Sequence, residues 1–161
     1  MTTFIREAYF DKLDTTDWAI LDELQVDARL SYAELGRRVG LSSPAVQERI
    51  RKLEDYGIIE GYRAVINLPK AGLPIVAFIR VGNLPGVDEG RLQRLVMNMN
   101  EVLECHHITG QDCYLVKIAA TSIPHLEQVI GRFAEFTHTV TTIVLSSPVQ
   151  NRVIKPSGDL N

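Results

Sequence analysis

The chain has 161 residues, of which 45% are apolar and 23% are charged, proportions typical of a globular protein with one or two domains. A net charge of −3 excludes a uniformly basic nucleic-acid binder but allows a local basic face. Two cysteines are too few for a disulfide framework and suit a reducing compartment. The N-terminus shows no signal-peptide pattern, and apolar runs such as Ile75–Ile79 are too short to span a bilayer. We therefore expect a cytoplasmic protein that has no membrane partner.

Three helix starts follow one another closely in the N-terminal part of the chain. Each combines a capping residue, which can accept hydrogen bonds from free backbone N–H groups, with two apolar residues that can pack across the first turn. The caps and their apolar pairs are Asp14 with Leu13 and Trp18, Ser31 with Leu30 and Leu35, and Ser42 with Leu41 and Val46. Glu34 completes a capping box with Ser31. Gly40 and Gly57 are placed to end helices.

The spacing of these helices predicts a helix-turn-helix. We expect the second helix at about residues 31–39 and the third at about 43–56, so that only Gly40-Leu41-Ser42 separates them. Two short helices joined by about three or four residues that include a glycine form this motif, with a three-helix piece of a larger α domain as the alternative. Residues Ile58–Ile66 are rich in β-branched side chains around Gly61, which predicts a small hairpin, or wing.

The C-terminal half alternates between strand and helix patterns. It follows a candidate linker, residues 67–74, that contains two prolines and a glycine. Expected strands cover 75–81, 102–109, 113–120 and 140–145, and expected helices follow Asp88 and Ser122. The order β-α-β-β-α-β predicts a ferredoxin-like α+β sandwich. The predicted parts of the chain are an N-terminal extension (1–12), a winged helix-turn-helix (13–66), the linker (67–74), a second domain (75–150) and a C-terminal tail (151–161).

The third predicted helix has an apolar face and an opposite polar face. Val46, Ile50 and Leu53 fall within about 60° of one another, so we expect them to face the other helices. In a helix-turn-helix the outward face enters the major groove, where Gln pairs with adenine, Arg pairs with guanine, and flanking basic residues bind phosphates. The candidate DNA-binding residues are Arg37, Arg38, Ser42, Ser43, Pro44, Gln47, Arg49, Arg51, Lys52 and Arg63. The alternative is a solvated amphipathic helix, and the outward Glu48 counts modestly against tight phosphate binding.

One cluster combines residue types that bind zinc, Cys105-His106-His107 with Cys113. On a strand, however, His106 and His107 point to opposite faces. A turn at Gly110-Gln111 would place Cys105 opposite Val116, so four ligands do not converge. We therefore expect no metal ion and no cofactor. The sequence also lacks the G-x-S-x-G, Walker-type, G-x-G-x-x-G and H-E-x-x-H motifs, so we do not expect an enzyme.

The turn itself, Thr109-Gly110-Gln111-Asp112, is a second candidate site. A glycine turn beside a carboxylate can offer backbone N–H groups and a negative charge to a zwitterion. Thr139 and Thr141, on the strand expected to return through the same sheet, are weaker candidates for the wall of this site. The alternative is a plain hairpin turn, in which Gly and Asp are common.

The N-terminal pattern resembles that of the Lrp/AsnC family, the leucine-responsive or feast/famine transcriptional regulators. The residues that carry the resemblance are Leu13-Asp14, Asp17, Ile20-Leu21, Asp27–Ser31, Glu34–Gly36, Val39–Ser42, Val46, Arg49, Leu53-Glu54, Gly57–Ile59 and Gly61-Tyr62. In the C-terminal half, residues 109–112 resemble the family's Gly-x-x-Asp hairpin, and the β-α-β-β-α-β order is that of its ligand domain.

This resemblance implies a transcriptional regulator that binds double-stranded operator DNA and responds to a small effector, mostly an amino acid in the family. It implies that residues 75–150 bind the effector near Thr109, Gly110, Gln111 and Asp112, and also assemble homodimers into octamers or similar rings. The alternative function is a small-molecule sensor or assembly protein whose helix-turn-helix is not used.

Overall fold

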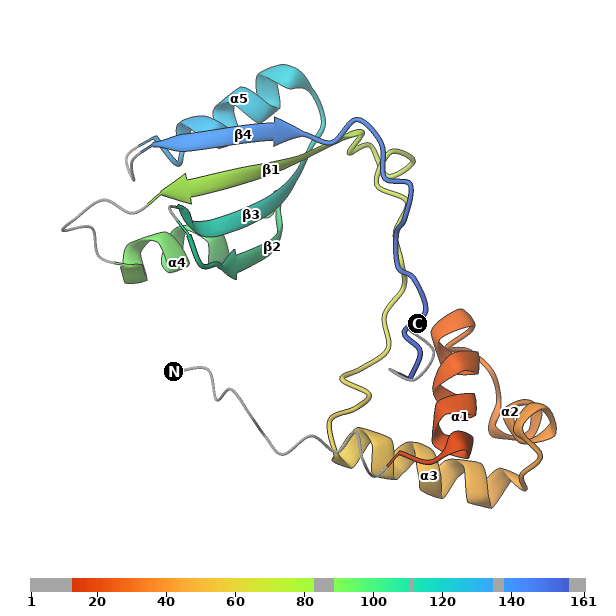
Figure 1. The fold of residues 1–161 in the computed structure, drawn as a ribbon. Coiled ribbons are helices and arrows are strands. Elements are labelled where there is room, and N and C mark those ends of the chain that lie inside the picture. The colour runs from red at the N-terminus through yellow and green to blue at the C-terminus, as the bar shows by residue number, and fades with distance from the viewer. Residues whose placement is uncertain (1–12, 83–88, 111, 135–137, 157–161) are drawn as a thin grey trace. The chain divides into compact units, whose positions relative to one another are not determined.

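The structure, a computed structural model, describes residues 13–82, 89–110, 112–134 and 138–156 (Figure 1). The chain divides into two compact units, one formed by residues 1–64 with 149–161 and the other by residues 65–148. No helix in the described ranges is long and apolar enough to cross a membrane. The predictions made for the extension, for Asp88 as a helix cap and for Gln111 lie outside the described residues.

The first unit is built from the three predicted helices. They are α1 (Thr15–Val26), α2 (Tyr32–Val39) and α3 (Ser43–Asp55). Their inward faces form one small core, whose buried members are Ile20, Leu21, Leu35, Val46, Ile50 and Leu53. The other members of the predicted apolar pairs pack against this core, which confirms them; they are Leu13, Trp18, Leu30 and Leu41.

The helix caps explain where α1 and α2 begin. Asp14 and Asp17 form a reciprocal capping box at α1, in which each carboxylate accepts the backbone N–H of the other residue, at 2.8 Å and 3.2 Å. At α2 the Ser31 hydroxyl accepts the Glu34 N–H at 3.2 Å, as predicted. The second half of that predicted capping box is wrong, because the Glu34 carboxylate binds two arginine side chains of α2 instead of returning to the cap.

The turn between α2 and α3 is closed by backbone hydrogen bonds to one carbonyl. Gly40 ends α2 in the left-handed region, with a φ of 73°. The N–H groups of Gly40 and Leu41 both donate to the carbonyl of Gly36, the latter at 2.8 Å. Only Gly40, Leu41 and Ser42 separate the two helices, which confirms the predicted helix-turn-helix.

The hairpin predicted over Ile58–Ile66 is wrong. After a turn at Gly57, the N–H groups of Ile58 and Ile59 donate to the carbonyl of Leu53 at 2.9 and 3.1 Å. Both isoleucine side chains pack against the helical core, so these residues close the end of α3 instead of pairing as a strand. The rest of the segment carries no strand pairing with any described residue.

Part of the predicted C-terminal tail returns to the first unit and contacts α1. The Ile154 N–H donates to Gln25 Oε1 at 2.8 Å, and Gln25 Nε2 donates to the Ile154 carbonyl at 3.1 Å. These two residues are 129 positions apart in the sequence, and no local pattern indicates that they meet. The first unit therefore combines the N-terminal helices with a described segment that follows the second unit in the sequence.

The second unit is an antiparallel sheet with two helices (Figure 1). Its elements are β1 (Ile75–Gly82), α4 (Glu89–Met97), β2 (Val102–His107), β3 (Asp112–Ala120), α5 (Ile123–Gly131) and β4 (Thr139–Ile143). The strand order β2-β3-β1-β4 confirms the predicted ferredoxin-like α+β fold. Both helices cover the same sheet face, because residues of α4 and α5 share one core with alternate residues of β1 and β3. This core includes Ala77, Ile79, Val81, Leu92, Val96, Tyr114, Val116, Ile118, Leu126 and Val129.

Candidate nucleic-acid interface and ligand site

Helix α3 presents the predicted polar face to solvent. Val46, Ile50 and Leu53 on its inner face are no more than 3% exposed. The exposed residues of the outer face are Pro44, Gln47, Glu48, Arg51 and Lys52. The hydrophobic period therefore predicted the orientation of α3 correctly, and the side chains able to read base edges point away from the core.

The start of α3 offers donors that suit a phosphate. Ser42 occupies the N-cap position and is exposed, but its side chain makes no capping hydrogen bond. Ser43 is half-buried, and Pro44 follows in the first turn. Free N–H groups at a helix N-terminus together with an exposed hydroxyl form a favourable environment for an anion.

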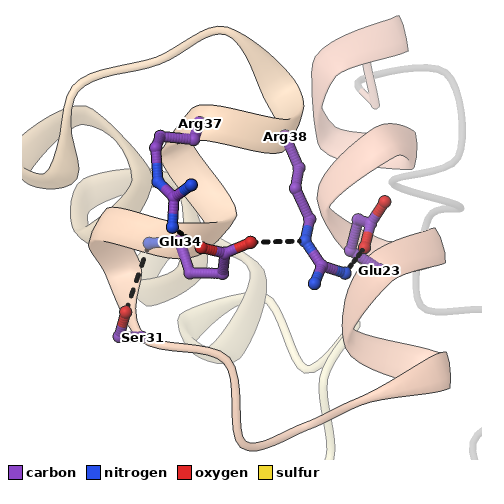
Figure 2. A network of polar contacts seen from close by, with 5 residues as sticks. All are labelled: Glu23, Ser31, Glu34, Arg37 and Arg38. Atoms are coloured by element: carbon purple, nitrogen blue, oxygen red, sulfur yellow. Dashed lines mark hydrogen bonds and ion pairs between the residues drawn. The ribbon is translucent and has the colours of Figure 1, made fainter.

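Figure 2 shows Arg37 and Arg38 held on α2 by the carboxylate of Glu34, whose backbone N–H donates to the Ser31 hydroxyl. Arg38 Nε donates to Glu34 Oε1 at 3.0 Å, and Arg38 Nη1 donates to Glu23 Oε2 at 2.6 Å. Arg38 thereby links α2 to α1. Arg37 donates to the second Glu34 oxygen, and its side chain is 77% exposed. Such an exposed pair contributes little to stability, so Arg37 can exchange Glu34 for a phosphate at low cost.

Arg49 has a different role from the other predicted cations. Its Nη1 donates to Asp14 Oδ2 and to Asp17 Oδ1, both at 2.7 Å. These contacts fasten α3 to the capping box of α1 and raise the pKa of the guanidinium. The three side chains line a groove of about 450 Å³ between the start of α1 and α3. To bind a phosphate, Arg49 would have to leave two carboxylates, so we assign it to the fold of the unit.

The contacts of Asp14 predict that the first unit loses stability in acid. Its backbone hydrogen bond from Asp17 and its contact with Arg49 hold the pKa of the carboxyl below its ordinary value. A carboxyl with a depressed pKa in the folded state stabilises the fold above its unfolded pKa and loses that contribution as the pH falls through the folded pKa. Asn at position 14 can still cap α1 but has no charge to titrate. The free energy of unfolding should therefore fall less for Asp14→Asn than for the wild type between pH 7 and pH 3.

The expected difference is no more than about 1 kcal/mol, because half of the Asp14 side chain is exposed. Urea titrations of both proteins at the two pH values measure it. Other carboxylates with depressed pKa values, such as Glu104, are common to both proteins and cancel in the comparison. An equal fall in the free energy of unfolding of the two proteins between pH 7 and pH 3 would contradict this account of the cap.

The remaining predicted cations are exposed and form only weak ion pairs, or none with the described residues. Lys52 pairs with Glu48 at 2.8 Å, which lowers the pKa of Glu48, and Arg51 pairs with Asp55 at 3.7 Å. Exposed pairs of this kind are worth little and are screened by salt. Arg63 is exposed and forms no ion pair with any residue that the structure describes. The outward Glu48 is thus neutralised locally by Lys52.

Three of the predicted ligand residues, Thr109, Gly110 and Asp112, lie in the second unit between β2 and β3 or at the start of β3. Cys105 pairs with Val116, as the predicted turn requires. Gly110 adopts a φ of 125°, a conformation that favours glycine, and Thr109 beside it is exposed. Asp112 begins β3 opposite Gly82. The described residues on either side of Gln111 therefore have the strand register that the predicted turn requires.

The two threonines predicted as a pocket wall lie on β4, which is not next to this turn in the sheet. Thr139 pairs with Val81, which pairs in turn with Tyr114 of β3. Two strand spacings, about 10 Å, therefore separate Thr139 from the β3 backbone. Thr141 pairs with Ile79, one step further from the turn. His107, the last residue of β2, lies closer to the turn than either threonine, and its ring stacks on Tyr114 with centroids 4.9 Å apart. The exposed end of β2 was not among the predicted ligand residues.

Comparison with known proteins matches both units to described domains. Residues 13–54 match the AsnC-type helix-turn-helix domain, and residues 76–154 match the Lrp/AsnC ligand-binding domain. The transcriptional regulator LrpC of Bacillus subtilis is 36% identical over 135 residues, which cover 84% of this chain and 93% of that protein. The chain belongs to the Lrp/AsnC family of transcriptional regulators.

Solved structures of Lrp/AsnC proteins have the same fold. Bacillus subtilis LrpC has a TM-score of 0.80 over 84% of this chain and 96% of its own. A transcriptional regulator from Neisseria meningitidis in complex with L-methionine has a TM-score of 0.82 and 29% identity, over 91% of this chain and 98% of its own. In sequence, a further relative is the leucine-responsive regulatory protein of Escherichia coli, which is 33% identical over 150 residues that cover 88% of this chain and 91% of that protein.

Proposed function

We propose that this Lrp/AsnC regulator reads operator DNA with α3 and that an amino acid bound in its second unit controls this binding. The observation that carries the first part is the two-faced α3: its inner face is buried, and its outer face holds Gln47 and Arg51. These are the residue types that pair with adenine and guanine in the major groove. The protein would act in the cytoplasm, where the operator is accessible.

The phosphate contacts would surround this base-reading face. Ser42, Ser43 and Pro44 at the start of α3 would approach one strand, since a helix N-terminus favours an anion. The exposed cations able to flank them are Arg37, Lys52 and Arg63. Arg38, predicted with them, is held by two carboxylates, Glu34 and Glu23. Arg49 is left out of this set because Asp14 and Asp17 hold it.

Binding to the DNA upstream of the protein's own coding sequence tests this proposal. Fluorescence anisotropy with that duplex should give tighter binding than with a scrambled duplex of equal length, and both affinities should fall with salt because phosphates contribute to each. Equal affinity for the two duplexes across several candidate operators, or no salt-dependent binding, would favour a sensor whose helix-turn-helix is not used.

The effector is proposed to be an amino acid bound near the β2–β3 turn. One neighbour in structure is a complex with L-methionine, and one relative is named a leucine-responsive regulator. The turn supplies exposed Thr109 and the open backbone of Gly110, which suit a carboxylate, while Asp112 would take the ammonium group. A thermal-shift screen of the twenty amino acids identifies the ligand, because a ligand that binds only the folded state raises the melting temperature.

Asp112→Ala should abolish that thermal shift while leaving DNA binding by the unliganded protein intact. The reason is that the ammonium group would lose the counter-charge that Asp112 supplies in the proposed site. Glu127→Ala, which removes an exposed carboxylate of α5 in the same unit, serves as the control and should keep the shift. An Asp112→Ala protein with an unchanged melting temperature and wild-type effector affinity, measured by calorimetry, would refute the assignment. Loss of stability with retained effector binding would show that Asp112 only closes the hairpin.

We further propose a homodimer formed through the sheet face opposite α4 and α5, and its assembly into octamers or similar rings. Phe78, Leu115 and Val140 lie on that face, and each is only half-buried. Phe78 and Leu115 alternate with core residues along β1 and β3, and Val140 pairs with Arg80, which lies on the same face as Phe78. Phe78→Asp should shift the protein towards its 18.0 kDa monomer in light scattering, since a charge on this face opposes burial. Met97→Asp, at an 84% exposed position of α4, should leave the assembly unchanged. A wild type that is monomeric at all concentrations would contradict the proposed dimer.

A further inference from the structure

The segment that follows α3 is fastened to that helix by Tyr62. The Tyr62 hydroxyl donates to Glu54 Oε1 at 3.0 Å. Partial burial, the hydrogen bond to Glu54 and the nearby Tyr32 raise the pKa of the phenol to about 12. The hydroxyl therefore stays protonated and keeps its role as donor throughout the range in which the protein works. This contact holds a stretch of chain that has no strand pairing with the described residues.

The anchor point lies on the flank of α3 that we propose for base reading. Glu54 is seven residues after Gln47, so the two side chains project within about 20° of each other around the helix axis. Arg51 lies about 60° away on the outward side of Glu54. The backbone held by Tyr62 therefore runs beside the flank that carries Gln47, and not beside the flank that Arg49 fastens to α1.

Arg63 is the cation whose position this contact controls. It follows Tyr62 directly, is exposed, and forms no ion pair with any described residue, in contrast to the other predicted cations. We infer that Tyr62 is a positioning residue, whose hydrogen bond to Glu54 fixes the backbone so that Arg63 meets a DNA phosphate beside α3. This inference rests on the proposed DNA binding by α3.

A purely structural role for Tyr62 makes a different prediction. If the hydrogen bond only stabilises the first unit, its loss lowers the melting temperature and affects DNA binding equally whatever residue stands at position 63. If it positions Arg63, the loss in affinity depends on Arg63 being present. A double-mutant cycle separates the two cases, because it measures the coupling between the two residues.

The experiment uses the full-length protein and a short duplex bound by the wild type. Arg63→Gln should weaken binding and lower the slope of log affinity against log salt by about one, as expected for one lost phosphate contact. Tyr62→Phe should weaken binding by about threefold or more, with a reduced salt slope. In the Arg63→Gln background, Tyr62→Phe should have no further effect. Tyr56→Phe makes the same chemical change on the other flank of α3 and should bind as the wild type does.

Substitutions of the acceptor test the same contact from α3. Glu54→Gln keeps an oxygen that can accept from Tyr62 and should retain most of the affinity, whereas Glu54→Ala should reproduce the loss seen for Tyr62→Phe. Wild-type affinity for Tyr62→Phe, or an equal loss with and without Arg63, would overturn the inference while leaving the proposed function intact. A wild-type protein that shows no salt-dependent binding to any duplex would remove both.

Discussion

Gly36→Ala should unfold most of the helix-turn-helix while the second unit stays folded. A Cβ atom at position 36 would lie 2.4 Å from the carbonyl oxygen of Leu41, far inside van der Waals contact. That carbonyl cannot move away freely, because Leu41 and Gly40 both donate to the Gly36 carbonyl and hold the turn closed. Overpacking against backbone costs about 3 kcal/mol at the upper end of its usual range. A unit of this size with one small core has only about 3–5 kcal/mol to lose.

Calorimetry of the full chain should show this as the loss or early onset of one of two transitions, and DNA binding should disappear with it. Gly131→Ala is the matched control: it lies at the end of α5, nothing stands within 4 Å of the added methyl, and its cost should be below about 1 kcal/mol. The loss of stability caused by Gly40→Ala should fall between those of the other two substitutions, because a φ of 73° strains a side chain although the space around it is open. Wild-type stability for Gly36→Ala would mean that the turn relaxes without cost.

Local chemistry explains which parts of the first unit were predictable. The caps at Asp14 and Ser31, the apolar pairs around them and the three-residue turn each depend on residues fewer than six positions apart. The buried stripe of Val46, Ile50 and Leu53 follows from helical periodicity alone, and it predicted which face of α3 is exposed to solvent. In the second unit, the turn at Gly110 fixed the pairing of Cys105 with Val116 by the same local logic.

The errors arose where a residue had more than one possible partner. Ile58 and Ile59 have strand propensity, but packing against the helical core competes successfully with hairpin formation. Glu34 is placed correctly for a capping box, yet two guanidinium groups outcompete one backbone N–H for its carboxylate. The contact between Gln25 and Ile154 was not predicted for a different reason. It depends on the path of the whole chain, and a single sequence contains no local indication of it.

Arg51→Ala should weaken operator binding by about 1–3 kcal/mol, or about 5- to 150-fold, without changing the melting temperature. Its side chain is 80% exposed and its ion pair with Asp55, at 3.7 Å, contributes little to the fold. A bidentate contact between its guanidinium and a guanine accounts for the expected loss, which should be smaller on scrambled DNA because no base is recognised there. Anisotropy titrations on both duplexes measure the two values.

Arg49→Ala separates a role in folding from a role in DNA binding. The substitution leaves Asp14 and Asp17 without the guanidinium that both contact at 2.7 Å, so the first unit should lose about 1 kcal/mol of stability. DNA affinity should fall only as far as the folded fraction falls, and equally on operator and scrambled DNA. Arg132→Ala in the second unit removes the same charge and should bind as the wild type does. If Arg49→Ala loses operator specificity at full folding while Arg51→Ala loses none, the two arginines have been assigned the wrong roles and α3 meets DNA with its other flank.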